Sequence, residues 1–166
     1  ASLDVLPGRR DAQERRRLEA HRLRFLFDEE GMLVYLDAKG GDPPVLRTVL
    51  TTQPLGSRPA PGRRVESRFL VSRLDPVSGA VREATFTDNV AFTEPGRKAW
   101  AGRAVHDEGA GLLTLTEDPR IVDEAEGTEL RARRIALGTR TRGVSASDNV
   151  RHTLAPRARS GRTGML

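Results

Sequence analysis

The side chains that could do catalytic or metal chemistry are few and widely separated. The three histidines, His21, His106 and His152, match no metal-ligand spacing, and the absence of cysteine removes any thiolate site. His106 is followed by Asp107, but adjacent residues on a strand point to opposite faces. We therefore expect no metal site, no cofactor and no catalytic centre.

Two further motifs have a structural explanation. Ser145 and Ser147 have no histidine in a plausible relation and lie in no G-x-S-x-G motif. The glycine-rich run at 109–111 predicts a hairpin turn, since no helix follows whose N-terminus could bind a phosphate. These residues add nothing to the case for an enzyme.

The composition is that of one folded domain with a basic surface. Hydrophobic residues make up 37% and charged residues 31% of the 166 residues, and the net charge is +5. A basic balance favours a polyanionic partner: nucleic acid, an anionic membrane surface or a phosphorylated glycolipid. The alternative for most individual arginines is an ordinary solvated surface.

Period-two alternation of apolar and polar residues predicts half-buried β-strands through most of the chain. In one of them, Val65, Ser67, Phe69 and Val71 are expected to share a face. The predicted strands cover residues 18–27, 32–39, 64–74, 80–93, 97–106, 112–122, 129–137 and 143–153.

The ends and one internal segment depart from this pattern. Residues 1–17 are a leader, in which good helix formers predict a short helix up to about Arg17. Residues 40–63 form a Pro-rich insertion, with a short predicted strand at 45–51. Residues 155–166 are predicted to be a flexible basic tail, so the β-domain itself spans 18–154.

A weak repeat of strand, turn and strand organises this domain. Turns that contain glycine, most of them with aspartate, fall at 28–31, 75–79, 107–111 and 138–143. The pairs Asp88 and Asn89, and Asp148 and Asn149, tolerate left-handed backbone geometry and are predicted to turn the chain into the next unit. No unit leaves room for a crossover helix, so the pattern predicts an antiparallel meander or jellyroll.

Residues 99–150 resemble the repeat of the OstA-like family of periplasmic lipopolysaccharide-transport proteins. A small-residue strand with Ala101 and Ala104 leads into an Asp-containing turn, and Leu113 and Leu115 match the family's L-x-L-x-G-x-V element. Residues 146–150 match its closing x-A-x-G-N-V element, and 84–92 resemble the end of the preceding repeat. Two features depart from the family: aspartate at 88, 118 and 148 in place of glycine, and the Pro-rich insertion.

The resemblance implies an all-β, open antiparallel β-jellyroll or β-taco built from repeated strand-turn-strand units. Its apolar interior would hold the acyl chains of a glycolipid, without catalysis. The expected lining residues are Phe69, Val71, Phe86, Val90, Phe92, Ala101, Ala104, Leu113, Leu115, Ile121, Ile135 and Leu137. The arginines expected at the rim, facing the head-group phosphates, are Arg68, Arg103 and Arg133.

The resemblance also implies a place and partners. The expected partners are lipopolysaccharide or a related glycolipid, other β-taco proteins of the same export system, and a second copy joined head to tail. The expected location is the periplasm, and a tether to the inner membrane through a segment upstream of Ala1 stays open. A soluble bridge, a membrane-anchored component and a segment of a longer multi-repeat protein are all compatible with the sequence.

Two other functions stay open at this point. A basic β-barrel could bind nucleic acid, but the aromatic residues occupy apolar alternating positions and the arginines are spread through every unit. A structural β-repeat scaffold without lipid is the other alternative.

Overall fold

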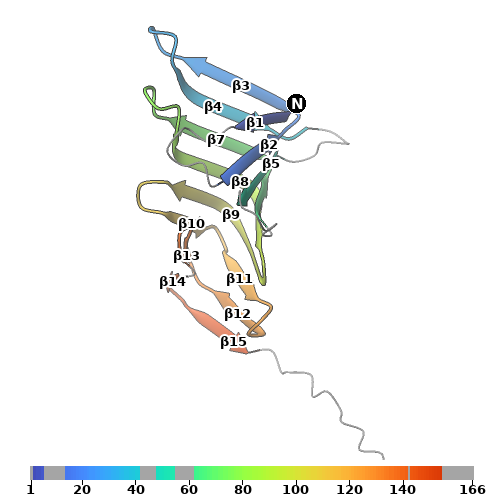
Figure 1. Ribbon diagram of the computed structural model, residues 1–166. Helices are drawn as coiled ribbons and strands as arrows, with labels where there is room; N and C mark the ends of the chain where they lie inside the picture. The colour runs from blue at the N-terminus through green and yellow to red at the C-terminus, as the bar shows by residue number, and fades with distance from the viewer. Residues whose placement is uncertain (1, 6–13, 42–47, 55–61, 142, 155–166) are drawn as a thin grey trace, which may run out of the picture.

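A computed structural model describes residues 2–5, 14–41, 48–54, 62–141 and 143–154 of the chain. Within these ranges there is no helix, and fifteen strands pair antiparallel in one folded sheet (Figure 1). The strands are β1 (Ser2–Val5), β2 (Glu14–Glu19), β3 (Arg22–Phe27), β4 (Leu33–Lys39), β5 (Thr48–Pro54), β6 (Arg63–Ser67), β7 (Phe69–Leu74), β8 (Val81–Glu94), β9 (Arg97–Asp107), β10 (Leu112–Thr116), β11 (Arg120–Asp123), β12 (Thr128–Arg131), β13 (Arg134–Gly138), β14 (Val144–Ser147) and β15 (Arg151–Leu154). The predicted all-β, open antiparallel fold class is therefore confirmed.

The sheet is bent into two half-sheets that share the long strands β8 and β9. The first half-sheet runs β3-β4-β7-β8-β9-β10-β13-β14, and the second runs β1-β2-β5-β6-β8-β9-β11-β12-β15. The strands stack along the long axis of the molecule, from β1 and β3 at one end to β14 and β15 at the other (Figure 1). Each end strand pairs on one side only within the described residues, so the sheet does not close into a barrel.

A fold line separates the two half-sheets, and pairs of left-handed residues lie on it at three places. Asp88 and Asn89 have φ values of 70° and 52° and interrupt the register of β8 between Thr87 and Val90. Two further adjacent pairs, 117–118 and 148–149, also have positive φ. Aspartate and asparagine tolerate this conformation because their short polar side chains bond locally. The left-handed geometry predicted for 88–89 and 148–149 is confirmed, but these pairs bend the sheet within a unit rather than joining units.

Backbone hydrogen bonds run along the fold line from strand to strand. The amide of Gly40 donates to the carbonyl of Arg68, whose own amide donates to the carbonyl of Asp88. Further along, the amide of Gly102 donates to the carbonyl of Glu117 over 2.8 Å. A side chain at Gly102 would be crowded, since a Cβ there would lie 2.7 Å from the Glu117 Cβ and 3.3 Å from its carbonyl oxygen. The bend therefore continues the ladder instead of breaking it.

The four predicted glycine turns are hairpins at the outer ends of the first half-sheet. They join β3 to β4, β7 to β8, β9 to β10 and β13 to β14. In the second of them Asp75 accepts hydrogen bonds from the amides of Val77 and Ser78 and from Arg82. These bonds, with the Ser78 amide contributing most, lower the pKa of Asp75 to about 2. The sequence predicted turns that contain glycine, most of them with aspartate, at these positions, and the hairpins have them.

The strand predictions place the elements well but miss the bends. Five of the eight predicted strands, such as 18–27 and 64–74, are each two strands that meet at the fold line. The short helix predicted up to Arg17 is wrong where it is described, because 14–17 belong to β2. Part of the Pro-rich insertion, Thr48–Pro54, is a regular strand between β2 and β6. The predicted tail at 155–166 lies outside the described residues.

Candidate functional site

The inner faces of the two half-sheets carry continuous apolar rows. Because directly opposed residues on antiparallel strands point to the same face, the registers define these rows residue by residue. In the first half-sheet one row crosses eight strands: Leu23, Ala38, Leu70, Phe86, Ala104, Leu115, Ile135 and Ala146. In the second the corresponding row is Leu18, Leu50, Val65, Phe92, Ala99, Ile121 and Leu130.

These rows pack on each other and form one core. Phe86, Leu115, Ile135 and Leu137 are all at most 2% exposed. Seven alanines lie among the buried core residues, at 20, 38, 84, 99, 101, 104 and 132. Small residues on facing strands bring the half-sheets close together. In this state the middle of the interior is filled by its own side chains.

Ten of the twelve predicted lining residues lie in this interior. The buried ones are Phe86, Val90, Phe92, Ala101, Ala104, Leu113, Leu115, Ile121, Ile135 and Leu137. The face predicted for Phe69 and Val71 is wrong, because they oppose Thr87 and Thr85 on the outer side of the sheet. The chain bends at Arg68, so the alternation of inward and outward residues on β6 does not continue unchanged into β7.

The three predicted rim arginines lie on the fold line, away from the open side of the sheet. Arg68 and Arg133 are at bends between strands, where their amides donate to the carbonyls of Asp88 and Asp148. Arg103 follows the corner residue Gly102 and opposes Thr87 and Thr116 on the outer face. All three are exposed, and their predicted place at the rim is wrong because the sequence does not show which end of each strand meets the bend.

A polar band lies at the outer ends of the inner faces instead. Arg16 and Arg63 precede Leu18 and Val65 by two residues, so both share the inward face of the second half-sheet. Glu94 and Arg97 lie opposite each other across the β8–β9 turn, are ion-paired and are each 7% exposed. The Arg63 Nε atom lies 3.3 Å from Glu94 Oε2.

This band crosses to the first half-sheet along a line that we call the mouth. Arg16 lies 3.6 Å from Glu108, which follows β9, and Arg140 lies 3.9 Å from the other oxygen of the same carboxylate. Arg63 donates a hydrogen bond to the carbonyl of Thr139, in the β13–β14 hairpin. The mouth is defined by Arg16, Arg63, Glu94, Arg97, Glu108, Thr139 and Arg140. None of these residues is among those predicted from the sequence, although Arg16 and Arg63 each lie two residues before an apolar residue of the same strand face.

His106 stands just inside the mouth. It lies in an inner row between Ala84 and Leu113, and its Nε2 atom is 3.6 Å from Glu108 Oε2. Burial lowers its pKa below the usual 6.5, although the nearby Glu108 carboxylate acts in the opposite direction. Asp107 points to the other face, as the alternation predicts, so the two side chains do not form an acid–base pair.

The ends of the stack expose apolar residues. Strand β3 presents Phe25, Leu26 and Phe27, of which Phe27 is 61% exposed. At the other end Val144 on β14 and Leu154 on β15 are exposed. The apolar interior therefore reaches the surface where the end strands lie.

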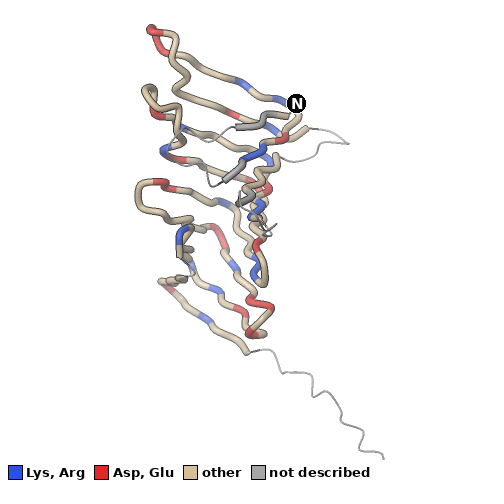
Figure 2. The backbone as a smooth tube through the Cα atoms, viewed as in Figure 1, with Lys and Arg blue, Asp and Glu red and all other residues tan. Residues whose placement is uncertain are grey.

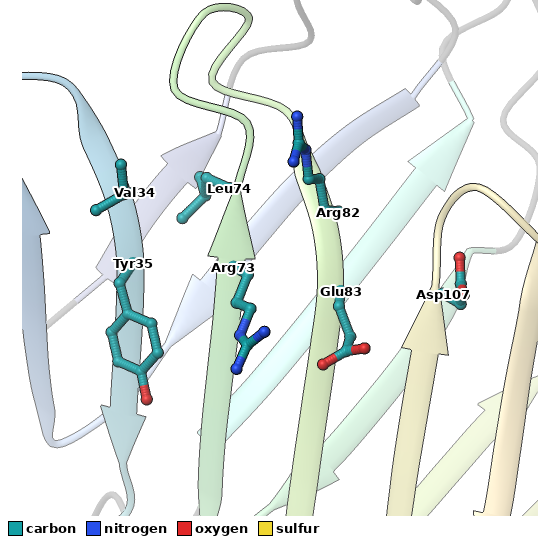
Figure 3. A pocket seen from close by; sticks show the side chains of 7 residues that line it. All are labelled: Val34, Tyr35, Arg73, Leu74, Arg82, Glu83 and Asp107. Carbon is teal, nitrogen blue, oxygen red and sulfur yellow. The ribbon is translucent and has the colours of Figure 1, made fainter. Parts of the chain in front are cut away.

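An open hollow of about 530 Å³ lies at the outer ends of β4, β7, β8 and β9 (Figure 3). Four of its seven lining residues, Tyr35, Arg73, Glu83 and Asp107, form one cross-strand row on the outer face. The remaining three are Val34, Leu74 and Arg82. Its mixed charges and outward position separate it from the apolar interior.

The outer face of the second half-sheet carries a short basic row. Trp100, Arg120, Arg131 and Arg151 oppose one another on neighbouring strands. The Arg120 guanidinium lies 4.3 Å from the centre of the Trp100 ring and covers it. Elsewhere basic and acidic residues are interspersed along the chain (Figure 2). One face of the Trp100 ring is therefore covered by an arginine of the same sheet and is not open to stacking by a nucleic-acid base.

The described residues contain no group of three metal-binding side chains and no helix long and apolar enough to span a membrane. Ser145 and Ser147 lie on the exposed outer face of β14.

A solved structure shares this architecture. LptH from Pseudomonas aeruginosa, described as the LptA homologous periplasmic component of the conserved lipopolysaccharide transport device, matches with a TM-score of 0.61. The match covers 85% of this chain and 95% of LptH at 12% sequence identity. No protein-family model and no curated protein sequence matches the chain. The likeness thus shows a common fold, the open antiparallel β-jellyroll.

Proposed function

We propose that this protein is a periplasmic transport component that binds lipopolysaccharide or a related glycolipid and carries it toward the outer membrane. The acyl chains occupy the space between the two half-sheets, and no chemical step is involved. The observation that carries the proposal is the pair of apolar rows that run through the whole stack on its inner faces. The fold shared with LptH agrees with it.

The energetics of such binding would come mainly from the acyl chains. Each buried CH₂ contributes roughly 0.8 kcal/mol, so several chains outweigh any exposed ion pair, which is worth about 0–1 kcal/mol. Because Phe86 and Leu115 are at most 2% exposed here, the acyl chains must displace side-chain contacts across the interior. Binding therefore requires the half-sheets to move apart.

Photo-crosslinking with purified lipopolysaccharide tests the proposal. Positions 86 and 115 point inward, whereas the neighbouring Thr85 and Thr114 on the same strands point outward. We expect capture of the lipid by crosslinkers at Phe86 and Leu115 and none at Thr85 and Thr114. Equal capture at the inward and outward positions, or capture at neither, would exclude the interior as the binding site.

The nucleic-acid alternative is tested by what co-purifies with the protein. A base-stacking surface needs bare aromatic rings on a basic face, and Trp100 is covered by Arg120. We therefore expect glycolipid, and no nucleic acid, in protein extracted from membranes. A scaffold without ligand would yield neither.

We further propose that the partners are other β-taco proteins or a second copy, joined head to tail through the end strands. Unpaired edges invite strand addition, and β3 and β14 expose apolar residues at their respective ends. Light scattering over a range of concentrations should show self-association or, with a relative of the same fold, mixed association. Monomers at all concentrations, alone and mixed, would contradict this.

A further inference from the structure

We propose that Arg16, Arg63 and Arg140 form a phosphate-binding site at the mouth, in which the Glu108 carboxylate occupies the place of the phosphate while no ligand is bound. The inference rests on the proposed function for the identity of the ligand, a phosphorylated glycolipid. The site is distinct from the rim expected from the sequence, since Arg68, Arg103 and Arg133 lie on the fold line.

The contacts bring the three arginines to one place from separate parts of the fold. Arg16, on β2, approaches one oxygen of the Glu108 carboxylate at 3.6 Å, and Arg140 approaches the other at 3.9 Å. The Arg140 guanidinium also donates a hydrogen bond to the backbone carbonyl of Glu108. Arg63, on β6, bonds to the backbone carbonyl next to Arg140. A phosphate, with three oxygens that accept strong hydrogen bonds, fits such a set better than a carboxylate does.

Guanidinium groups gather at the mouth. Those of Arg16, Arg63, Arg97 and Arg140 contact the carboxylates of Glu94 and Glu108 there. A phosphate monoester carries about −1.5 to −2 at neutral pH, so it can pair with more than one guanidinium group at once.

The same contacts cross the mouth from one half-sheet to the other. Arg16 and Arg63 belong to the second half-sheet, whereas Glu108 and Thr139 belong to the first. A phosphate that binds Arg16 and Arg140 replaces Glu108 and so removes the ion pair that crosses the mouth. Head-group binding and the opening needed by the acyl chains would then be one event.

The test compares two lipids that differ only in phosphate: diphosphorylated lipid A and the same lipid without its phosphates. The opening is measured as the distance between spin labels on Ala110→Cys and Thr93→Cys, two exposed positions in the two half-sheets. The chain contains no cysteine, so labelling is specific. We expect the phosphorylated lipid to bind at least about tenfold more tightly and to lengthen the distance, while the dephosphorylated lipid does neither at the same concentration.

Single substitutions test whether the arginines of the mouth bind the phosphate. Arg16→Ala should lengthen the distance without ligand and abolish the preference for the phosphorylated lipid. Arg17→Ala is the matched control, because Arg17 is the next residue on β2 and pairs with Glu19 on the outer face. Glu108→Gln should open the mouth without ligand yet keep the preference, since it leaves the arginines in place.

The outcomes distinguish this proposal from the proposed function. Equal affinity for the two lipids, or a preference that survives in Arg16→Ala, overturns the phosphate site while leaving lipid binding intact. If neither lipid binds, the proposed function is wrong. The phosphate-binding site is then tested by adding inorganic pyrophosphate and measuring the same spin-label distance. Pyrophosphate that lengthens the distance in the unmodified chain but not in Arg16→Ala upholds a site for free phosphate; no change in either overturns it.

Discussion

Leu115→Ala tests whether the interior between the half-sheets is packed or open. Leu115 lies in the middle of the first inner row, between Ala104 on β9 and Ile135 on β13, and is 1% exposed. The substitution removes three buried carbon atoms, worth about 2.4 kcal/mol at roughly 0.8 kcal/mol each. The two β-strand neighbours cannot collapse into the space, so a cavity term adds to this loss. We expect the free energy of unfolding to fall by about 3–4 kcal/mol.

The assay is urea unfolding followed by the fluorescence of Trp100, the chain's only tryptophan. In a separate thermal unfolding experiment the same loss should lower Tm by roughly 6–16 °C for a chain of this size. Thr114→Ala on the same strand is the control, because Thr114 opposes Val105 and Ala136 on the outer face. It should cost less than about 1 kcal/mol. A loss below about 1 kcal/mol for Leu115→Ala would refute the packed interior and with it the need for the half-sheets to part.

Three further predictions concern stability. Asn89→Val places a β-branched residue at a φ of 52° and should cost about 1–2 kcal/mol, whereas Asn89→Gly should cost less than about 0.5 kcal/mol; equal losses would exclude backbone strain as the cause. Gly102→Ala places a methyl group 2.7 Å from the Glu117 Cβ and should cost about 1–3 kcal/mol, while Gly109→Ala, with 3.4 Å to its nearest neighbour, should be nearly neutral in thermal unfolding. Because burial lowers the pKa of His106, the unfolded chain binds its proton more readily, so stability should decline as the pH falls below about 6.5. His106→Leu should flatten this part of the stability profile, and an unchanged slope would assign it to another group.

Local patterns in the sequence determined the strands, the hairpins and most of the interior. Alternation with period two needs only the residues of one strand, which is why Leu113, Leu115, Ile135 and Leu137 were placed on one face correctly. The turns at 75–79 and 107–111 follow in the same way from residues that bond to their own backbone. Such patterns involve only a few neighbouring residues, so they can be recognised without knowledge of the fold.

The tertiary structure alone decided where the sheet bends and which residues meet across it. The bend at Arg68 shifts the alternation by one residue, so Leu70 rather than Phe69 faces inward. No local pattern marks this bend, at which the Arg68 amide donates a hydrogen bond to the carbonyl of Asp88 on another strand. The mouth depends on the bend in turn: Arg16 meets Glu108 because two half-sheets, distant along the chain, fold onto each other. Alternation assigns a residue to a face, but only long-range strand pairing decides what that face packs against.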